Sequence, residues 1–364
     1  MKVKFTSLFK LVAQKKAILS KINYLVKNSK FIAGPEVENF EKKFSNFTGS
    51  KFCVSVANGT DALEIAVKSL NLKKNSEIIV PVNTWISTAE AVVNNGYKLV
   101  FCDVNLDDYT ISIDDLKKKI NKKTKAIIAV HLYGNPANMN KIKKIANRKK
   151  IKIIEDCAQA HGSKINGKHV GNFGQIATFS FFPGKNLGGF GDGGAIITNS
   201  KSLYDYCKRA RNHGSSSKYD HKFSGRNSRL DTIQSAVLNI KLNSYNKVLS
   251  RRKRLAKIYF NKLKNIKDIK VFNLKKLNTY CFHQFVIRLK TRDKLKKYLA
   301  KNMIDTSVHY PYMLNELKFF PKSNLKNSKN LGKKILSLPI SEEHSKKEIE
   351  YVAKKINDFF DKAR

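Results

Sequence analysis

Lys185 lies in a segment whose other residues are mostly apolar or glycine. The segment covers residues 179–194, reads FSFFPGKNLGGFGDGG, and begins inside a run that predicts a β-strand. Burial in such surroundings lowers the pKa of a lysine amine and makes the amine a usable nucleophile near neutral pH. The segment therefore predicts a lysine that reacts with a carbonyl group. A glycine-rich hairpin without chemistry is the alternative interpretation.

A second chemical feature is Asp156, which follows the apolar run at residues 151–155 within the stretch EDCAQAHG. A carboxylate at the end of a buried strand is costly unless it meets a cation or hydrogen-bond donors. A protonated pyridine nitrogen would be such a cation. The alternative is an aspartate that only begins a turn.

A third feature is the stretch NGTD at residues 58–61, which opens a predicted helix directly after a predicted strand. Gly59 allows close approach of the backbone, and Thr60 adds a hydroxyl where free helix N–H groups favour an anion. Ser180, on the strand that leads to Lys185, can also donate to a phosphate. The alternative is that Asn58, Thr60 or Asp61 only caps the helix.

Together the three segments provide a phosphate site, a carboxylate for a pyridine nitrogen and a lysine for a Schiff base. Each follows a predicted strand, and in an open α/β sheet ligands bind beyond the carboxyl ends of the strands. The combination predicts a pyridoxal phosphate site.

The elements that must position these residues follow the pattern of βαβ units around a mainly parallel sheet. Helical spacing occurs at residues 61–70, 87–94, 113–120 and 140–148. The last two predicted strands are joined by the glycine-rich loop, which leaves no room for a helix, so one of them is expected to be antiparallel. Seven strands are predicted for one large sheet: residues 52–56, 77–80, 99–103, 126–130, 151–155, 177–181 and 195–198.

After residue 226 the pattern changes to a smaller α/β unit. One long helix is expected over residues 230–263, and a short amphipathic helix is expected at the N-terminus. We expect a large domain over residues 1–245, including that helical segment, and a small C-terminal domain over residues 246–364. Within the small domain, strands are predicted at 269–273 and 280–288, and helices at 293–301 and 348–360.

The charge of the chain is extreme, because 71 Lys+Arg face 28 Asp+Glu and the formal net charge is +43. Such a charge attracts polyanions, and a polyanion-binding or regulatory protein without turnover is the alternative from a different functional class. The basic residues are spread along the chain on predicted helix faces, however, and no nucleic-acid-binding motif accompanies them. No specific nucleic-acid partner is expected.

The five cysteines are scattered and show no C-x-x-C spacing, so neither a disulfide framework nor a metal site is indicated. Lysine or arginine interrupts every apolar stretch, which argues against a membrane span. We expect a cytoplasmic protein.

The sequence resembles the DegT-type nucleotide-sugar aminotransferases, which are pyridoxal phosphate enzymes of fold type I. The resemblance covers essentially the whole chain. It is carried by residues 34–41, 58–63, 81–90, 131–134, 155–162, 179–194, 225–231, 309–311 and 336–339.

The resemblance implies roles for individual residues. Lys185 would hold the cofactor covalently and then move the substrate proton, while Asp156 would pair with the pyridine nitrogen. Gln159 would contact the O3′ side of the ring, and Trp85 would stack on the ring face; without the resemblance, core packing is the plain interpretation of Trp85. The remaining cofactor contacts would come from Gly59, Thr60, Ser180 and Asn227, with Asn227 reaching the phosphate bound by the neighbouring subunit of a homodimer.

The resemblance is closest to the subgroup that aminates a 3-keto sugar. The stretches PGKNLG, NTWIST and NHG carry this assignment, whereas members that aminate C4 read differently around the lysine. Lys185 also argues against the dehydratase subgroup, which has a histidine there. The implied reaction moves the amino group of L-glutamate to the C3 ketone of a dTDP- or UDP-linked deoxysugar for a surface glycan such as the O-antigen of lipopolysaccharide. Amination of a 4-keto sugar is the nearest alternative, and the segments that would approach the sugar nucleotide contain His213, His309 and Tyr310.

Overall fold

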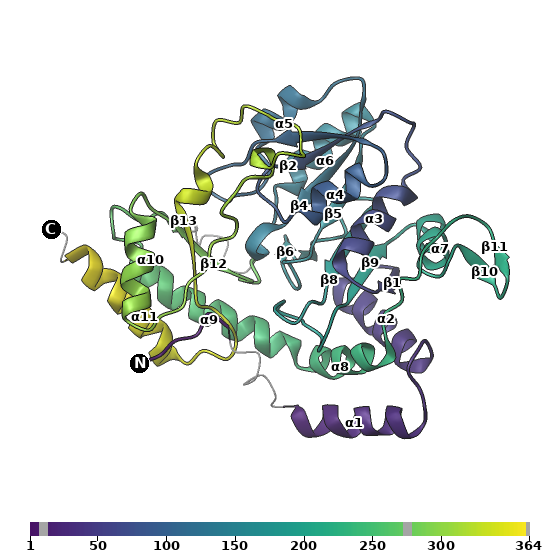
Figure 1. The fold of residues 1–364 in the computed structure, drawn as a ribbon, viewed down its shortest axis with the longest axis horizontal. Coiled ribbons are helices and arrows are strands. Elements are labelled where there is room, and N and C mark those ends of the chain that lie inside the picture. The colour runs from purple at the N-terminus through teal and green to yellow at the C-terminus, as the bar shows by residue number, and fades with distance from the viewer. Residues whose placement is uncertain (7–13, 272–278, 362–364) are drawn as a thin grey trace.

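The computed structural model describes residues 1–6, 14–271 and 279–361. Its centre is a seven-stranded sheet with the order β1-β9-β8-β5-β4-β2-β3 (Figure 1). All seven predicted strands are confirmed, and β9 is antiparallel to both of its neighbours, as expected for the last pair. The strands are β1 Phe52–Val56, β2 Glu77–Pro81, β3 Lys98–Cys102, β4 Thr124–Val130, β5 Lys152–Asp156, β8 Ile176–Ser180 and β9 Gly194–Thr198.

Helices cover both faces of this sheet because the strand residues are buried on both sides. On one face Phe179 of β8 packs with Phe40 and Phe44, whereas on the other Ile176 packs into the cluster that contains Leu63 and Ile65. The helices around the sheet are α2 Pro35–Thr48, α3 Gly59–Ser69, α4 Ser87–Val93, α5 Ile113–Lys119, α6 Met139–Lys149, α7 Lys201–Ala210 and α8 Thr232–Asn243.

The predicted helix over residues 230–263 is two helices, α8 and α9 Tyr245–Leu263, which meet at Ser244. Asn243 and Ser244 favour a helix end over a helix interior, because their side chains compete with the backbone for hydrogen bonds. The Ser244 hydroxyl is 2.6 Å from Nε2 of Gln14. The N-terminal helix is α1 Lys15–Lys27, and the earlier residues 7–13 of that prediction lie outside the described residues.

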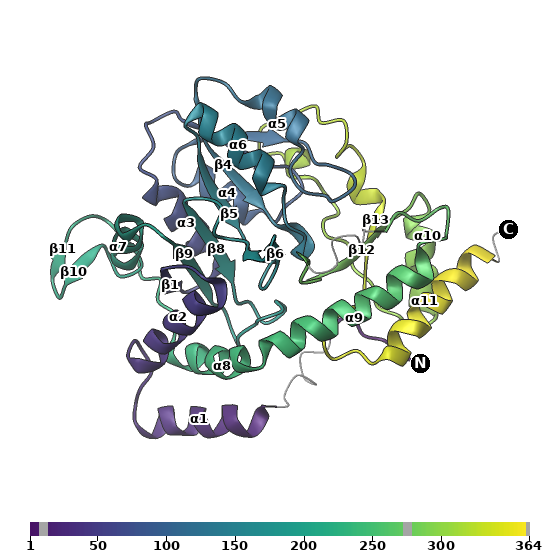
Figure 2. The same ribbon diagram turned by 180° about the vertical axis from the view of Figure 1, so that it is seen from behind.

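The C-terminal part is a smaller α/β layer reached along α9, and Figures 1 and 2 show both chain termini at this end of the molecule. The strand predicted over 280–288 is shorter than expected. The strand predicted over 269–273 is reduced to an isolated bridge between Lys270 and Arg288 in its described part, and residues 272 and 273 lie outside the described range. Val3 pairs with Ile304, so the first residues of the chain join this layer. Its elements are β12 Phe285–Arg288, β13 Ile335–Leu338, α10 Arg292–Lys301 and α11 Lys346–Asp361.

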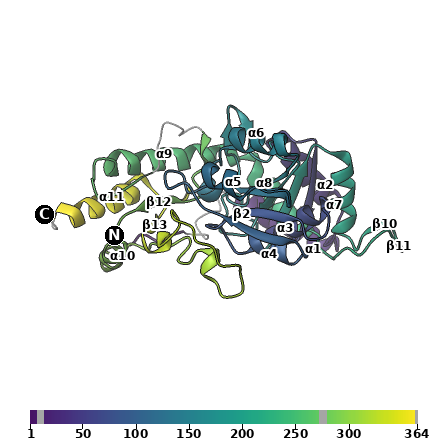
Figure 3. The same ribbon diagram turned by 90° about the horizontal axis from the view of Figure 1, so that it is seen from above.

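Short hairpins and 3-10 turns complete the described elements. The hairpin β10–β11 extends away from the body of the molecule in all three views (Figure 3). None of the described helices has the length and apolar character that a membrane crossing requires. The hairpin strands are β6 Lys164–Ile165, β7 Lys168–His169, β10 Ser215–Ser217 and β11 Asp220–His221, and the 3-10 turns are η1 Leu132–Gly134, η3 Leu314–Glu316 and η4 Leu331–Lys333.

Candidate active site

A cavity of about 450 Å³ lies beyond the carboxyl ends of β1, β2, β5 and β8, between the large sheet and the C-terminal layer. The cavity brings together most of the residues selected from the sequence. Those that line it are Gly59, Thr60, Trp85, Asp156, Gln159, Ser180, Lys185, His309 and Tyr310.

Lys185 lies in the loop between β8 and β9. The glycines of this loop are required by its path, since a Cβ on Gly188 would lie 2.5 Å from the carbonyl oxygen of Pro183. The glycines are therefore needed to form the loop, as the hairpin interpretation expects. That interpretation does not account for the buried amine of Lys185. Burial lowers the pKa of Lys185 to about 8, although the negative charge of Asp156 partly offsets this effect by raising the pKa. The amine thus changes protonation near neutral pH, as a nucleophile or a proton carrier must.

Asp156 ends β5 and is almost fully buried. One carboxylate oxygen accepts a hydrogen bond from the backbone N–H of Ala158 at 3.0 Å, and the other accepts from the hydroxyl of Thr88 at 2.9 Å. Burial nevertheless raises its pKa above the ordinary value, although these hydrogen bonds and the charge of Lys185 lower it. A carboxylate in this state gains from a further cationic donor such as a protonated ring nitrogen.

The first turn of α3 forms the other end of the cavity. Asn58 is the N-cap, because its side-chain oxygen accepts from the N–H of Asp61 at 2.8 Å. The capping interpretation thus holds for Asn58, but it leaves the N–H groups of Gly59 and Thr60 without an intrahelical acceptor. A Cβ on Gly59 would lie 2.7 Å from the Cβ of Ser180, so only glycine allows Ser180 this close to the helix terminus. The arrangement fits an anion such as a phosphate.

Trp85 does not belong to the core, so the plain interpretation of this residue was wrong. Its side chain is 57% exposed, because it follows the carboxyl end of β2 at the mouth of the cavity. Its ring contacts that of Tyr310 with centroids 5.6 Å apart. The position provides an aromatic surface at the mouth of the cavity that Asp156 also lines.

Gln159 connects the two layers. Its side-chain oxygen accepts from the N–H of Tyr133 at 2.7 Å, and its nitrogen donates to the phenol oxygen of Tyr310 at 3.0 Å. Tyr133 also donates from its hydroxyl to the carbonyl oxygen of His309. Tyr310 and His309 of the C-terminal layer are thereby hydrogen-bonded to residues of the segments that follow β4 and β5.

Two predicted residues do not line the cavity of this chain. His213 and Asn227 are both exposed and lie on the segments that flank the β10–β11 hairpin. The neighbouring backbones are joined by a bridge between Asn212 and Asn227.

The structure adds residues that the sequence did not single out. His283 lines the cavity, and its Nδ1 lies 3.1 Å from the side-chain oxygen of Asn186, the residue after Lys185. Ser87 also lines it, with its hydroxyl 2.8 Å from that of Thr60. A lone histidine in the apolar run CFHQF gives no local signal of a role, whereas Ser87 lies inside the stretch NTWIST.

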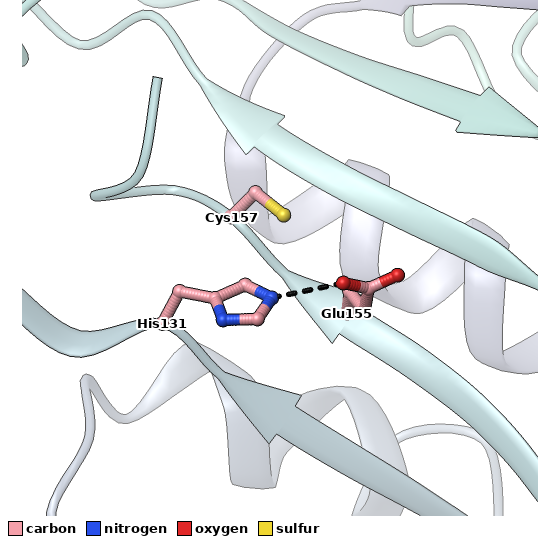
Figure 4. Close-up of side chains that lie close together, drawn as sticks. All are labelled: His131, Glu155 and Cys157. Carbon is pink, nitrogen blue, oxygen red and sulfur yellow. Dashed lines mark hydrogen bonds and ion pairs between the residues drawn. The ribbon is translucent and has the colours of Figure 1, made fainter. Parts of the chain in front are cut away.

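The buried side chains of His131, Glu155 and Cys157 lie close together (Figure 4), and Glu155 and Cys157 flank Asp156 in the sequence. His131 accepts from the N–H of Ala137 at Nδ1, so its Nε2 carries the proton and donates to Glu155 at 3.0 Å. Burial alone would raise the pKa of Glu155, but this hydrogen bond and those from backbone N–H groups lower it. Because the chain itself uses both ring nitrogens and both carboxylate oxygens, the group supports the strand end that carries Asp156.

Comparison with known proteins agrees with this geometry. The profile of the DegT/DnrJ/EryC1/StrS aminotransferase family matches residues 12–357. A dTDP-3-amino-3,6-dideoxy-alpha-D-galactopyranose transaminase of Aneurinibacillus thermoaerophilus is 39% identical over 94% of this chain and 95% of its own. A UDP-N-acetyl-3-dehydro-alpha-D-glucosamine 3-aminotransferase of Acidithiobacillus ferrooxidans is 38% identical over 92% of both chains.

The fold comparison gives the same result. The crystal structure of DesV from S. venezuelae, described as a complex with a ketimine intermediate, superimposes with a TM-score of 0.94. It is 33% identical in sequence and matches over 98% of both chains.

Proposed function

Because this chain belongs to the DegT/DnrJ/EryC1/StrS aminotransferase family, we propose that it moves the amino group of L-glutamate to the C3 ketone of a dTDP- or UDP-linked deoxysugar. The chain is a pyridoxal phosphate-dependent aminotransferase of fold type I. The observation that carries the proposal is the position of Lys185 in one cavity with Asp156 and the first turn of α3.

The cavity residues fit the cofactor by their chemistry. The N–H groups of Gly59 and Thr60, with the hydroxyl of Ser180, would hold the phosphate at the positive end of α3. Asp156 would accept a hydrogen bond from the ring nitrogen and keep it protonated, and Trp85 would cover one ring face. When bound, pyridoxal phosphate supplies an electron sink that stabilises negative charge on the substrate carbon.

Lys185 would serve in both halves of the reaction. Its pKa of about 8 lets the amine Nζ hold a proton and release it within the physiological range. In the first half it would take the proton from the carbon that bears the glutamate amine, and in the second half it would return a proton to C3 of the sugar. Glutamate would leave as 2-oxoglutarate before the sugar nucleotide binds, so ping-pong kinetics are expected.

The choice of C3 rests on the sequence around the lysine and on the names of similar proteins. The relatives from Aneurinibacillus and Acidithiobacillus are both described as 3-amino or 3-aminotransferase enzymes. The same names support a nucleotide-linked sugar as the acceptor. A surface glycan such as O-antigen as destination and a cytoplasmic location complete the proposal.

A homodimer with shared sites is the proposed assembly. His213 and Asn227 lie off the cavity of their own chain, on the exposed base of a hairpin that extends from the body. In the proposed dimer these residues contribute to the cavity of the second copy. The division into residues 1–245 and 246–364 remains our proposed domain boundary, at the start of α9.

The test incubates the purified protein with pyridoxal phosphate, L-glutamate and matched 3-keto and 4-keto sugar nucleotides, and identifies the products by NMR. We expect an amine at C3 of the 3-keto sugar and no product with Lys185→Ala. Turnover of the 4-keto substrate alone would assign the enzyme to C4. No turnover combined with tight, salt-dependent DNA binding that does not require Lys185 would favour the polyanion-binding alternative.

A further inference from the structure

The hydrogen bonds around Tyr310 determine which role its phenol group plays. The N–H of Tyr133 can only donate, so the side-chain oxygen of Gln159 must face it, 2.7 Å away. The amide nitrogen of Gln159 therefore faces Tyr310 and donates to the phenol oxygen at 3.0 Å. The oxygen of Tyr310 is thus an acceptor in this bond, and its own proton remains available for another partner.

The part of the chain that the structure describes offers the Tyr310 proton no acceptor. The side chain lines the cavity, with its ring against Trp85 at the mouth. Burial and the charge of Asp156 raise the pKa of the phenol, which outweighs the lowering by the hydrogen bond from Gln159. Tyr310 consequently keeps its proton at physiological pH. A donor in such a cavity is expected to meet an acceptor on a ligand.

We propose that Tyr310 donates this hydrogen bond to the phenolic oxygen on the ring of pyridoxal phosphate, O3′. The proposal rests on the proposed function, since it requires the cofactor in this cavity. Asp156 and Gln159 lie on one short turn after β5, so a ring whose nitrogen meets Asp156 has an adjacent edge near Gln159. Tyr310 acts at that same edge, because its oxygen is bonded to Gln159. The residue is thereby reassigned from the sugar nucleotide to the cofactor.

The consequence is electrostatic. O3′ shares a proton with the nitrogen that would join the cofactor to Lys185. A hydrogen bond donated by Tyr310 to the anionic O3′ favours the form in which this shared proton has been lost, and so lowers the pKa of the bound cofactor. Besides Tyr310, the titratable and charged groups that line this cavity are Asp156, Lys185, Asp192, Arg252, His283 and His309. Burial and the charge of Lys185 lower the pKa of His309 to about 4, so this histidine stays neutral while the cofactor titrates.

The test compares the full-length Tyr310→Phe protein with Tyr312→Phe, a matched control in which the side chain is 66% exposed and does not line the cavity. Each protein is loaded with pyridoxal phosphate, and the absorption band of the bound cofactor is titrated with pH. Loss of a hydrogen bond to a charged oxygen is expected to raise the midpoint by about one pH unit or more. Tyr312→Phe should titrate like the wild type.

Tyr310→Phe keeps the ring against Trp85, so the emission of this only tryptophan reports whether the variant folds normally. A folded Tyr310→Phe protein with an unchanged midpoint would overturn the proposal. If its midpoint is unchanged but its reaction with the keto sugar is slower, Tyr310 acts on the substrate instead. If the wild-type protein itself binds no pyridoxal phosphate, the proposed function fails first, and the two failures are distinguishable.

Discussion

Gly59 and Ser180 lie so close together that a Cβ on Gly59 would be 2.7 Å from the Cβ of Ser180 and 3.3 Å from its backbone Cα. The two residues come from different elements, the first turn of α3 and the end of β8. Their contact brings the Ser180 hydroxyl beside the free N–H groups of the helix. The proposed phosphate site therefore depends on the absence of a side chain at position 59.

Gly59→Ala is expected to weaken the binding of pyridoxal phosphate at least about tenfold, because steric overlap of this kind typically costs about 1–3 kcal/mol. Equilibrium titration of the cofactor absorption band measures the change. Ser180→Gly in the same background removes the overlapping Cβ and should recover thermal stability without recovering full affinity. Unchanged affinity in Gly59→Ala would exclude this part of the cavity as the phosphate site.

The pH dependence of cofactor uptake should follow the protonation of Lys185. The neutral amine is the nucleophile, so the rate should be low below the pKa of about 8 and rise as the pH passes through it. Asp156 raises this pKa by its charge, and Asp156→Asn is therefore expected to move the midpoint to lower pH. Stopped-flow measurement of uptake against pH gives both midpoints.

Asp192→Asn is the control for this experiment, since Asp192 is an exposed carboxylate at the cavity that does not contribute to the pKa of Lys185. Its midpoint should equal that of the wild type. An Asp156→Asn midpoint that stays in place or moves to higher pH would contradict the described relationship between the carboxylate and the lysine.

Glu155→Gln should destabilise the protein by about 3 kcal/mol or more, because each buried hydrogen-bonding group left without a partner typically costs about 1–3 kcal/mol. Each carboxylate oxygen accepts from at least one backbone N–H: one from Phe173 and Gly174, the other from Gly171. An amide NH2 group in either position would face a donor. Denaturant unfolding measures the loss, and the exposed Glu316→Gln serves as the control.

The carboxylate of Glu155 also determines the direction in which the free energy of unfolding should change with pH. The pKa of Glu155 in the folded protein lies below its ordinary value. The stabilisation that the carboxylate provides is therefore fully present above the pKa that Glu155 has in the unfolded chain, and it is lost as the pH falls through the pKa in the folded protein. The free energy of unfolding of the wild type should therefore fall with acidification in this range. A Glu155→Gln protein with wild-type stability and the same acid dependence would show that the Glu155 carboxylate does not stabilise the folded protein.

The sheet and most residues of the cavity were predictable from sequence because their signals are local. Each strand is an apolar run with polar residues at its carboxyl end, as with Asp156 after β5 and the NGTD stretch after β1. The topology of parallel strands then places these ends at one edge of the sheet. The resemblance to known aminotransferases added the roles that the residue types alone left open.

The features that were missed depend on contacts between distant parts of the chain. The strand predicted over 280–288 is short because the N–H groups of Cys281 and Gln284 donate to the carbonyl oxygens of Gly134 and Tyr133 instead of a neighbouring strand. His283 enters the cavity as part of this crossing segment. Tyr133, which holds both Gln159 and His309, had no local signal of its role for the same reason.

The most direct test of the central claim is to locate the covalent bond between the protein and its cofactor. The protein is loaded with pyridoxal phosphate, the linkage is reduced with borohydride, and peptide mass spectrometry identifies the modified lysine. We predict one phosphopyridoxyl group, on Lys185, although many other lysines are spread along the chain. Modification scattered over exposed lysines, or none at all, would contradict the account.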